Sequence, residues 1–533
     1  MPLPAALVPL RHSVFRMLWT ANLVSNIGGW VQNTGAGWLM TSLSPSPLMV
    51  SLVQAASLLP VFLLALPAGA LADLVDRRWF LIGAQAWICA MAVILSLLTA
   101  FGLLGPWGLL ALTFAIGMGS AANFPAWSAT TPEIVPRADL PQAIVLNGIG
   151  FNLARAVGPA IGGLLIAWVG TAATFAFNAV SFLYLIVALF LWNRPVQTQT
   201  MPGEGLVAAM RTGVRYVVNS PTMRGIVVRG TVAFFFAAAV WGLLPLLVRQ
   251  RLHLGPEAFG LMLGCMGVGA VTAGFLLPYA RSRLSRSNLV VVSGIVSGLS
   301  VTGLGLSTHW FPAGLSLLVY GATWISVAST LQAAAQLTAR PWVRARAIGL
   351  YQVTTFGGLA AGSFLGGTLG NAAGIPVALT VFGLGGAACT WLVRGLRIEL
   401  PPPGAAPADG QVEPRPADPA PELLPTLTAR NDRVLEAVRY RVPNGQRAGF
   451  MAAMAEVRGV RLRAGALAWR LYADVARPDL YVELWAVESW TDHLREQARL
   501  SEGDHAALAR AAAFHAGADG AGPEAARYVH LPL

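Results

Sequence analysis

Twelve long apolar stretches recur along this chain, and they constrain its fold more than any other feature. Each approaches the roughly 20 mostly apolar residues that a helix needs to cross the hydrocarbon core of a bilayer. Of the 533 residues, 55% are hydrophobic and 11% are charged, whereas a soluble domain carries about 25% charged residues. We therefore predict a polytopic membrane protein and exclude soluble, disordered, collagen-like and disulfide-scaffold chains. The stretches cover approximately 17–42, 47–72, 79–103, 107–130, 141–168, 171–193, 222–248, 257–280, 288–308, 312–338, 345–370 and 374–395.

The arginines between these stretches indicate how the chain crosses the membrane. One set of alternate loops holds nearly all of them, and only Arg249 and Arg251 fall in the other set. Membrane proteins retain their basic loops on the cytoplasmic side. We therefore expect an even number of spans, with both termini, the 194–221 loop and the tail in the cytoplasm. The net charge of +12 then reflects membrane loops, and we expect no nucleic acid partner because the arginines form no single patch.

Two segments 204 residues apart are similar without a gap, AIVLNGIGFNLARAVGPAIGGLL at 143–165 and AIGLYQVTTFGGLAAGSFLGGTL at 347–369. They belong to the fifth and eleventh stretches, so both enter the membrane from the same side. This indicates a parallel repeat of two six-helix bundles, 1–193 and 222–398, joined by the cytoplasmic loop 194–221. An amphipathic segment in that loop predicts a short helix on the anionic inner leaflet.

The composition changes after the last stretch. Pro and Ala dominate 399–429, which predicts an extended linker. The domain at 430–533 begins with the alternating pattern RVLEAVRYRV, which is typical of a strand. A helix after Asn444, strands near 466–476 and 480–488, a helix from Ser489 and a strand near 526–531 complete a β-α-β-β-α-β order. The predicted fold class is an all-α polytopic membrane protein, with twelve transmembrane helices in two six-helix parallel repeats and a small ferredoxin-like α+β C-terminal domain.

The loop GALADLVDRRWFL at 69–81 joins the second and third stretches. Gly69 allows close helix packing, and Asp73 lies at a helix end, where a carboxylate can accept backbone or arginine hydrogen bonds. This pattern resembles the signature loop G-x-L-x-D-x-x-x-R-R/K of the major facilitator superfamily, with Asp76 where that family has Gly. The resemblance implies a cytoplasmic gate of breaking and re-forming charge pairs, and a charged inner loop without a gating role is the alternative. We name as gate residues Gly69, Asp73, Arg77, Arg78 and, at the inner end of the fourth stretch, Glu133.

The fifth stretch contains RAVGPAIGG, in which small residues and a proline recur. Such residues thin and bend a membrane helix, so that its neighbours can approach and rock. GPxxGG resembles the helix-5 motif of the drug/proton antiporter branch of the superfamily, and ordinary small-residue packing is the alternative. The predicted helix-packing motif is Gly158, Pro159, Gly162 and Gly163.

A narrower resemblance covers nearly the whole chain. NGIGFNLARAVGPAIGGLL in the fifth stretch and FRMLWTANLVSNIGGWVQNTGAGWLMTSL in the first are its most specific parts. Both are similar to the bacterial transmembrane secretion effectors, exporters related to the enterobactin exporter. The resemblance implies a multi-pass protein of the bacterial cytoplasmic (inner) membrane.

Arg155 lies near the middle of the fifth stretch. A charge at that depth is costly unless it is paired or hydrated, so it indicates a functional site. We predict that it contacts an anionic group of the substrate, and snorkelling or bonding to carbonyls is the alternative. Polar side chains elsewhere, such as the helical stripe formed by Asn22, Asn26 and Asn33, must face a partner or water. The predicted substrate-binding residues are Asn22, Asn26, Asn33, Asn123, Asn147, Asn152, Arg155, Tyr351 and Gln352, with interhelical hydrogen bonds as the alternative role.

No carboxylate falls at mid-depth in the twelve stretches, which leaves the coupling ion open. A proton antiporter usually uses a carboxylate or a histidine inside the membrane. Here either Asp73 or Glu133 couples from the inner edge, or the substrate carries the charge, or the mechanism is unusual. The three cysteines are scattered through apolar stretches, so we expect neither a metal site nor a cofactor.

The C-terminal domain resembles the dimeric α+β domain of antibiotic-biosynthesis monooxygenases. His493, His505, Trp469 and Tyr472 are the residues that such an active site could use, but no metal or cofactor spacing accompanies them. We favour a regulatory or dimerising module over an enzyme.

These observations together predict a secondary active transporter of the major facilitator type. It would export a small amphipathic, siderophore-like or drug-like molecule by alternating access, with the substrate, the lipid bilayer and, if coupled, protons as its partners. A lysophospholipid flippase or importer on the same fold is one alternative. A monooxygenase-like enzyme that the membrane part merely anchors is the other.

Overall fold

The computed structural model describes residues 5–136, 138–193, 206–340, 342–396, 398–399, 433–517 and 522–529. The chain divides into two compact units. The first comprises 1–203, 225–335 and 348–398, and the second comprises 204–224, 336–347 and 399–533. The predicted linker at 399–429 lies outside the described residues, apart from Glu399.

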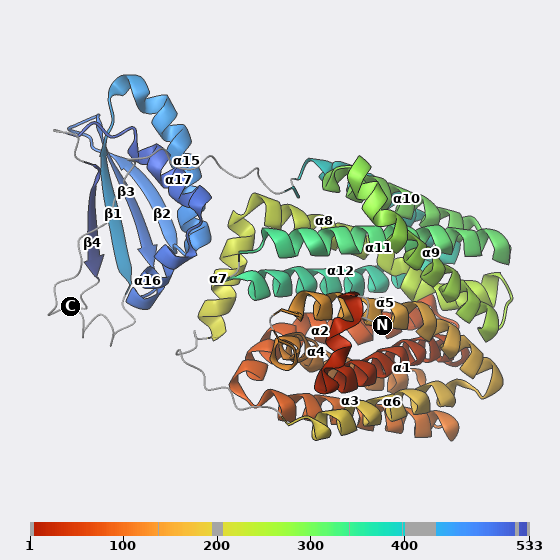
Figure 1. The fold of residues 1–533 in the computed structure, drawn as a ribbon. Helices are drawn as coiled ribbons and strands as arrows, with labels where there is room; N and C mark the ends of the chain where they lie inside the picture. The colour runs from red at the N-terminus through yellow and green to blue at the C-terminus, as the bar shows by residue number, and fades with distance from the viewer. Residues whose placement is uncertain are drawn as a thin grey trace. The chain divides into compact units, whose positions relative to one another are not determined.

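Long helices build the first unit (Figure 1). A bilayer offers no hydrogen-bond partner to a bare backbone, so apolar stretches of this length must be helical. Nine segments within the described residues are long and apolar enough to cross a membrane. In chain order the helices are α1 (Ser13–Leu43), α2 (Pro47–Leu74), α3 (Arg77–Ala100), α4 (Pro106–Ile134), α5 (Leu140–Trp168), α6 (Thr171–Leu191), α8 (Pro221–Leu246), α9 (Pro256–Arg283), α10 (Arg286–Leu306), α11 (Trp310–Thr338), α12 (Arg344–Ala373) and α13 (Ile375–Leu392).

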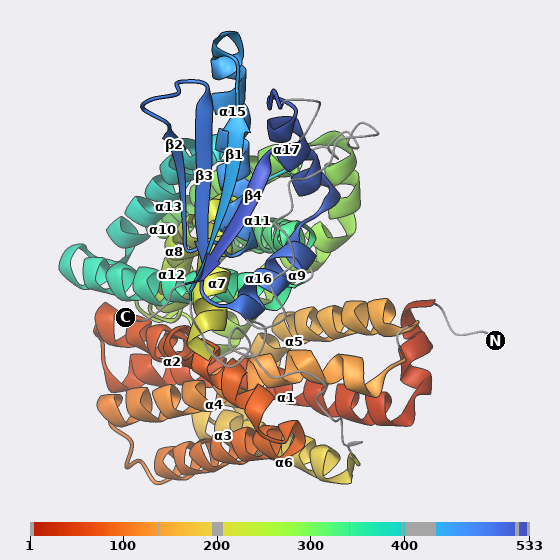
Figure 2. The ribbon, with the colours of Figure 1, turned by 90° about the vertical axis from the view of Figure 1, so that its left-hand side faces the viewer.

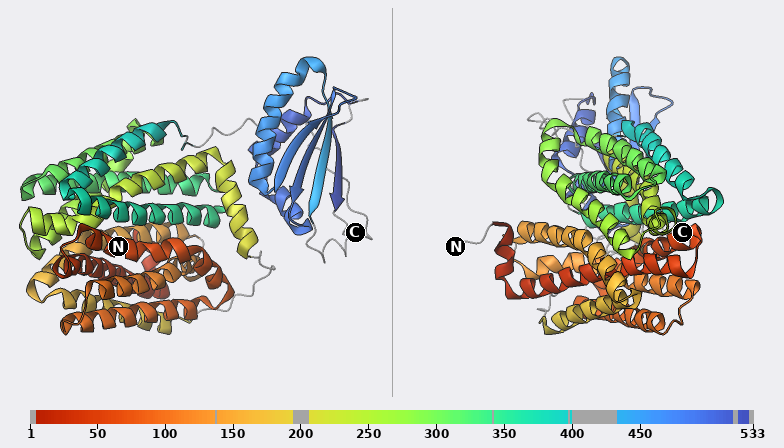
Figure 3. Two further views of the ribbon diagram at one scale, coloured as in Figure 1. Left: turned by 180° about the vertical axis from the view of Figure 1, so that it is seen from behind. Right: turned by 90° about the vertical axis from the view of Figure 1, so that its right-hand side faces the viewer.

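The helices gather into two bundles, α1–α6 and α8–α13 (Figures 1 and 3). In the first bundle, α1 and α3 pack on α6, and α2 packs on α4. In the second, α10 packs on α13. Helix α5 packs on α1 and also on α9 of the other bundle, so it forms a seam between the two halves.

Small residues allow that seam to close. A Cβ atom added at Gly163 would lie 2.6 Å from the Cα atom of Gly260 in α9. On the α1 side, an added Cβ at Gly158 would lie 2.5 Å from the Cβ of Trp30, and one at Gly162 would lie 3.0 Å from the Cβ of Thr34. The motif therefore lets α5 approach α1 and α9 at once.

The second unit contains a four-stranded sheet in the order β2-β3-β1-β4, with every neighbouring pair antiparallel (Figure 2). Side chains of β1 and β3 alternate between faces, and those of one face, such as Tyr440 and Trp485, join Phe450 in a buried apolar core. The elements are β1 (Val434–Arg441), α15 (Arg447–Ala464), β2 (Ala468–Ala473), β3 (Leu480–Val487), α16 (Trp490–Arg499), α17 (Glu502–Ala512) and β4 (Glu524–Val529). Helix α17 was not foreseen, although Ser501 and Asp504 form a capping box at its start.

The helix predicted in the middle loop is α7 (Leu206–Asn219), but its surroundings differ from the expectation. Tyr216 and Val217 are buried, and the helix packs against α15. The Tyr216 hydroxyl donates a hydrogen bond to the carbonyl oxygen of Thr338 at 3.0 Å. Protein, and not lipid, therefore covers this side of α7.

We predict that Gly163→Ala destabilises the first unit. The added methyl group meets the backbone of Gly260, and overpacking of this kind costs about 1–3 kcal/mol. Thermal unfolding of the detergent-purified protein should occur at a lower temperature. Gly148→Ala is the matched control, because an added Cβ at this position of α5 has nothing within 4 Å and should leave unfolding unchanged. Equal stability of the two variants would contradict the close seam.

Candidate functional site

A cavity lies where both bundles meet, and Arg155 and Asn152 of α5 line it together with residues of α8, α9 and α11. One guanidinium nitrogen of Arg155 donates to the Asn152 Oδ1 at 3.1 Å. No carboxylate of the described residues forms an ion pair with Arg155. Among the described residues, the guanidinium in this cavity therefore hydrogen-bonds only to a neutral amide.

Two tryptophans add hydrogen-bond donors to the same cavity. Trp241 of α8 and Trp324 of α11 both line it. The indole Nε1 of Trp324 is buried without a hydrogen-bond partner in the described structure, whereas the Trp241 side chain faces the Tyr320 hydroxyl. An indole N–H can only donate, and a buried donor left unsatisfied costs about 1–3 kcal/mol. The walls thus offer donors and positive charge, which an oxygen-rich anion would satisfy.

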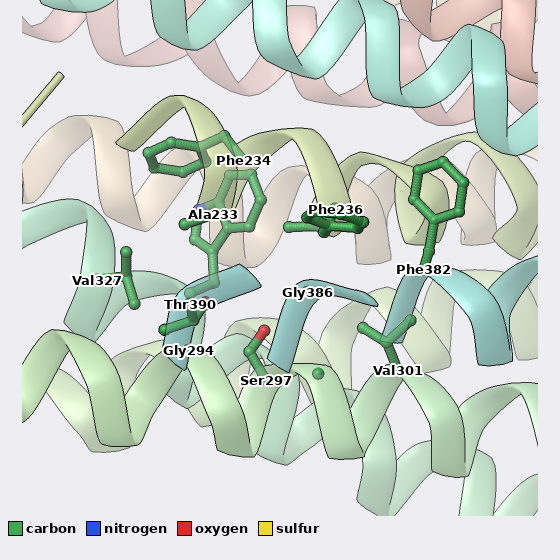
Figure 4. Close-up of a pocket in the computed structure, with 13 residues that line it drawn as sticks. Ala233, Phe234, Phe236, Gly294, Ser297, Val301, Val327, Phe382, Gly386 and Thr390 are labelled. Carbon is green, nitrogen blue, oxygen red and sulfur yellow. The ribbon is translucent and has the colours of Figure 1, made fainter. Parts of the chain in front are cut away.

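Two further pockets adjoin this cavity through shared residues. Asn33 of α1 lines one of them, together with Trp30 and the same Trp241. Trp324 lines the other, an apolar pocket inside the second bundle, where Phe236 packs against Phe382 with ring centres 5.8 Å apart and Phe234 lies on the opposite side (Figure 4). Polar and apolar lining surfaces therefore lie next to each other.

Several of the other predicted binding residues form hydrogen bonds within or between helices. Asn123 accepts a hydrogen bond from the Gln85 side chain at 2.8 Å, and Asn147 donates to the Thr131 hydroxyl at 3.0 Å. Asn26 donates to the backbone of Asn22 at 2.8 Å. For Asn26, Asn123 and Asn147, these bonds match the interhelical or local role that was the alternative.

Tyr351 and Gln352 belong to α12 and do not line the cavity of Arg155. Tyr351 is 3% exposed, and its ring packs against Gly230 of α8. The Gln352 Oε1 is buried without a hydrogen-bond partner among the described residues, so it stays a candidate contact.

The predicted inner gate has a definite geometry around Arg77 and Arg78. Arg77 forms an ion pair with Glu133 of α4, and both side chains are largely buried. Arg78 donates to the carbonyl oxygens of Leu189 at 3.0 Å and Phe190 at 2.6 Å, at the end of α6. These contacts join the ends of α3, α4 and α6.

The rest of the signature loop is only partly described. Asp76 is the N-cap of α3 and accepts a hydrogen bond from the Trp79 amide at 3.1 Å, a role that Gly has no side chain to fill. Gly69 and Asp73 belong to the last turns of α2, and their environment lies outside the described residues.

At the end of the bundles remote from Arg77, Arg249 forms a contact that sequence analysis did not predict. Arg249, in a short π-helical segment after α8 (Leu247–Arg251), donates to the Thr41 hydroxyl at 2.9 Å and the Ser42 hydroxyl at 2.5 Å. Ser46 and Asn371 are hydrogen-bonded at 3.1 Å across the same end. Arg251 instead donates to the carbonyl oxygen of Ser307 at 2.8 Å, inside its own bundle. The two exceptions to the arginine pattern are therefore bound by protein.

The sheet domain holds a buried polar cluster around three carboxylates, Glu436, Glu483 and Glu496. Tyr440 and Trp469 donate to Glu483 at 3.0 Å and 2.9 Å. His493 contacts Glu436, whereas Tyr472 is half-exposed. Of the four residues suggested for an active site, Trp469 and His493 belong to this cluster.

Glu436, His493 and Glu496 place ligand atoms within 4.8 Å of one another, so they are the described residues best placed to hold a metal ion. Two guanidinium groups already compensate their charge, because Arg527 lies 3.7 Å from Glu436 and Arg461 lies 3.8 Å from Glu496. A buried cation beside two arginines would be repelled, so the cluster fits a structural charge network better than a metal site.

The two bundles, the seam and the cavity between them define a transporter of the major facilitator type. The family model of the transmembrane secretion effectors matches residues 4–531, and the chain therefore belongs to this family. The match extends across the C-terminal domain.

Curated relatives and solved structures agree with this class. The chain is 28% identical over 333 residues to the enterobactin exporter of Citrobacter koseri, which covers 60% of this chain and 76% of that protein. It is 21% identical over 290 residues to the staphyloferrin A transporter of Staphylococcus aureus, covering 54% and 73%. A bacterial homologue of the human lysosomal transporter Spinster shares the fold, with a TM-score of 0.60, 14% identity and coverage of 72% and 97%.

We predict that the sheet domain loses stability as the pH rises through the titration of Glu496. Burial, opposed by Arg461 and reinforced by Glu436, raises the pKa of Glu496 from 4.5 to about 7. The folded state thus binds its proton more tightly, and its stabilisation is complete below pH 4.5 and disappears as the pH passes 7. The change is on the order of 3 kcal/mol.

Hydrogen exchange of β1 in the full-length protein, corrected for the intrinsic rate, measures this effect. Glu496→Gln should remove the pH dependence and protect β1 at pH 8. Glu456→Gln, which alters an exposed carboxylate paired with Arg510, should behave like the parent. A parental pH profile in Glu496→Gln would show that another group is responsible.

Proposed function

We propose that this protein exports a small, acidic, siderophore-like molecule across the bacterial cytoplasmic membrane by alternating access. The observation that carries the proposal is the cavity between the bundles, where Arg155 lacks an acidic partner and the Trp324 indole N–H lacks an acceptor among the described residues. The relatives named for enterobactin and staphyloferrin A support the same class of substrate.

The cavity's chemistry supports a more specific description of that substrate. Arg155 favours a carboxylate or an acidic hydroxyl group, because a guanidinium binds planar oxygen anions through two parallel hydrogen bonds. Trp241 and Trp324 would donate to further oxygens and stack on flat rings. The neighbouring pocket of Phe234 and Phe382 would take the apolar part. An amphipathic, oxygen-rich acid fits these groups.

The hydrogen bonds between the halves support an inward-facing state. They join α1 to the segment after α8, and α2 to α12 through Ser51 and Ser363. All these contacts lie toward the end that the arginine pattern assigns to the outside. We infer that Arg249 is part of an outer latch, which must release for the substrate to leave.

The topology and the gate complete the proposal. We propose that α1, α4 and α12 span the membrane along with the nine apolar segments, so that twelve spans leave both termini in the cytoplasm. Arg77, Arg78 and Glu133 would hold the inner ends of the first bundle, with Gly69 and Asp73 beside them. Gly158, Pro159, Gly162 and Gly163 would form the rocking seam. Proton coupling through Asp73 or Glu133 stays a hypothesis.

We further propose that the ferredoxin-like domain dimerises through the sheet face turned away from its helices. Leu435 and Tyr528 are paired neighbours on β1 and β4 and are 39% and 48% exposed. Two such faces could cover each other as in a β-sandwich. A domain of this kind serves regulation, and neither a lipid-flipping nor an anchored-enzyme role has a described feature that favours it.

We predict that Arg155→Leu impairs export much more than Arg155→Lys. Loss of a charged hydrogen bond costs about 1.5–3 kcal/mol, so the apparent affinity should fall about 10- to 100-fold. Lys keeps the positive charge but lacks the planar guanidinium with its parallel N–H donors, so it should restore part of the secretion rate. The measurement is the initial rate of enterobactin secretion by a host that lacks its own exporter.

The control for this experiment is Arg283→Leu. Arg283 lies over the ring of Tyr279 at the end of α9, away from the cavity lining. Secretion should be normal in this variant. Parental secretion by a well-expressed Arg155→Leu protein would remove Arg155 from the binding site, and failure of the parent to secrete enterobactin would exclude that substrate.

We predict that Arg249→Ala shifts the protein toward outward opening. It removes two hydrogen bonds between the halves, each worth about 1 kcal/mol in net terms, so the populations should change roughly 30-fold. Spin labels on Ser44→Cys and Ala372→Cys should show longer distances. Arg251→Ala, whose arginine bonds only within its own bundle among the described contacts, should leave the distances unchanged, and so serves as the control. Identical distance distributions in both variants would refute the latch.

A further inference from the structure

The segment 336–347, which joins α11 to α12, belongs to the same compact unit as the sheet domain. Arg340 is its main contact residue. The guanidinium forms an ion pair with Asp504, donates to the carbonyl oxygen of Arg499 at 3.0 Å and donates to the Ser501 hydroxyl at 3.2 Å. One arginine of the α11–α12 connection thus binds three groups around the start of α17.

The surroundings of Asp504 keep its carboxylate buried and ionised, so that it can pair with Arg340. Its side chain is 4% exposed, it accepts a hydrogen bond from the Ser501 amide at 3.0 Å within the capping box, and Arg463 lies 3.2 Å away. Burial alone would raise the pKa of Asp504, but the hydrogen bond from Arg340 and those from Ser501 lower it overall. The carboxylate is therefore ionised and buried, and the loss of Arg340 would remove one of its two cations.

Aromatic contacts extend the interface on the Arg499 side. The Arg499 guanidinium lies 4.6 Å from the centre of the Trp342 ring and donates to the carbonyl oxygen of Ala464 at 3.0 Å. Trp342 also packs edge-on against Tyr216 of α7, with ring centres 6.0 Å apart. A guanidinium over an aromatic face adds a cation–π attraction to the contact.

Helix α7 provides a second attachment to the same domain. Arg215 donates to the carbonyl oxygen of Gly465 at 3.4 Å, and Gly213 lies close to the Cβ of Arg346. Arg211 and Glu488 are 3.9 Å apart but well exposed, so this pair contributes little. The domain therefore contacts the α11–α12 hairpin and the helix that joins the two halves.

A contact on the α11–α12 hairpin is placed where it can affect the movement of the helices during transport. Helix α11 carries Trp324, which lines the cavity, and the second bundle continues through α12. Alternating access requires the inner ends of these helices to move relative to the other bundle. A folded domain attached at Arg340 would resist that movement.

We propose that the C-terminal domain is a binding module for the transporter's own α11–α12 hairpin, and that its docking through Arg340 and Asp504 slows the transport cycle. The regulatory part rests on the proposed export function, whereas the docking itself does not. Release of the domain would free the hairpin and raise turnover.

Hydrogen exchange of the purified full-length protein tests the docking. Arg340→Ala should speed exchange at least tenfold in segments 338–344 and 498–504, while β1 keeps its protection and so reports an intact domain. Arg340→Lys should restore part of the protection. Arg344→Ala is the matched control on the same hairpin, because Arg344 donates to the carbonyl oxygen of Ala339, and it should match the parent. Unchanged exchange in Arg340→Ala would overturn the docking.

Transport by the same variants tests the regulatory role. Arg340→Ala should raise the initial rate of enterobactin secretion severalfold, and Arg344→Ala should not. Faster hydrogen exchange with an unchanged or reduced secretion rate would show that the domain docks on the hairpin but does not slow transport. If no variant secretes enterobactin, the proposed substrate fails, and the exchange data still decide whether Arg340 holds the domain.

Discussion

Every polar group placed inside a membrane must find its partner in the protein or in water, and this constraint organises the helical unit. Gln32 and Asn178 satisfy each other between α1 and α6 at 2.6 Å. Arg229, an intramembrane arginine that sequence reasoning overlooked, is 2% exposed and donates to carbonyl oxygens at the end of α13 and the start of α10. Beside Arg155, by contrast, the buried indole N–H of Trp324 has no acceptor among the described residues.

The contacts at the two ends of the bundles differ in kind. At the end remote from Arg77, short side chains and Arg249 join the two halves directly. At the other end, the Arg77–Glu133 pair holds helices of one bundle together. The sheet domain adds a third set of contacts, through Arg340, on the hairpin of the other bundle. Different parts of the chain therefore form the contacts at the two ends of the bundles.

Sequence reasoning succeeded where a single periodic signal decided the outcome. Apolar length predicted the helices, and alternation in 433–442 predicted β1. It was weaker for polar residues, because an amide on a helix looks the same whether it bonds a neighbour or faces a cavity. Asn123 and Asn147 bond to side chains of neighbouring helices, whereas Asn33 lines a pocket. Trp241 was missed, since an indole in an apolar stretch gives no indication that its ring lines a cavity.

Hydrophobic length, arginine placement and small-residue motifs are local properties of the chain. They decide directly how a segment inserts into a bilayer and packs there, so they are enough to define the class of the protein. The family match across residues 4–531 agrees with that class. Only the tertiary structure decided which charges meet. Arg340 and Asp504 are far apart in the chain and carry no shared motif, yet folding places them in one buried pair. Such pairing depends on how whole elements pack, and no local pattern encodes it.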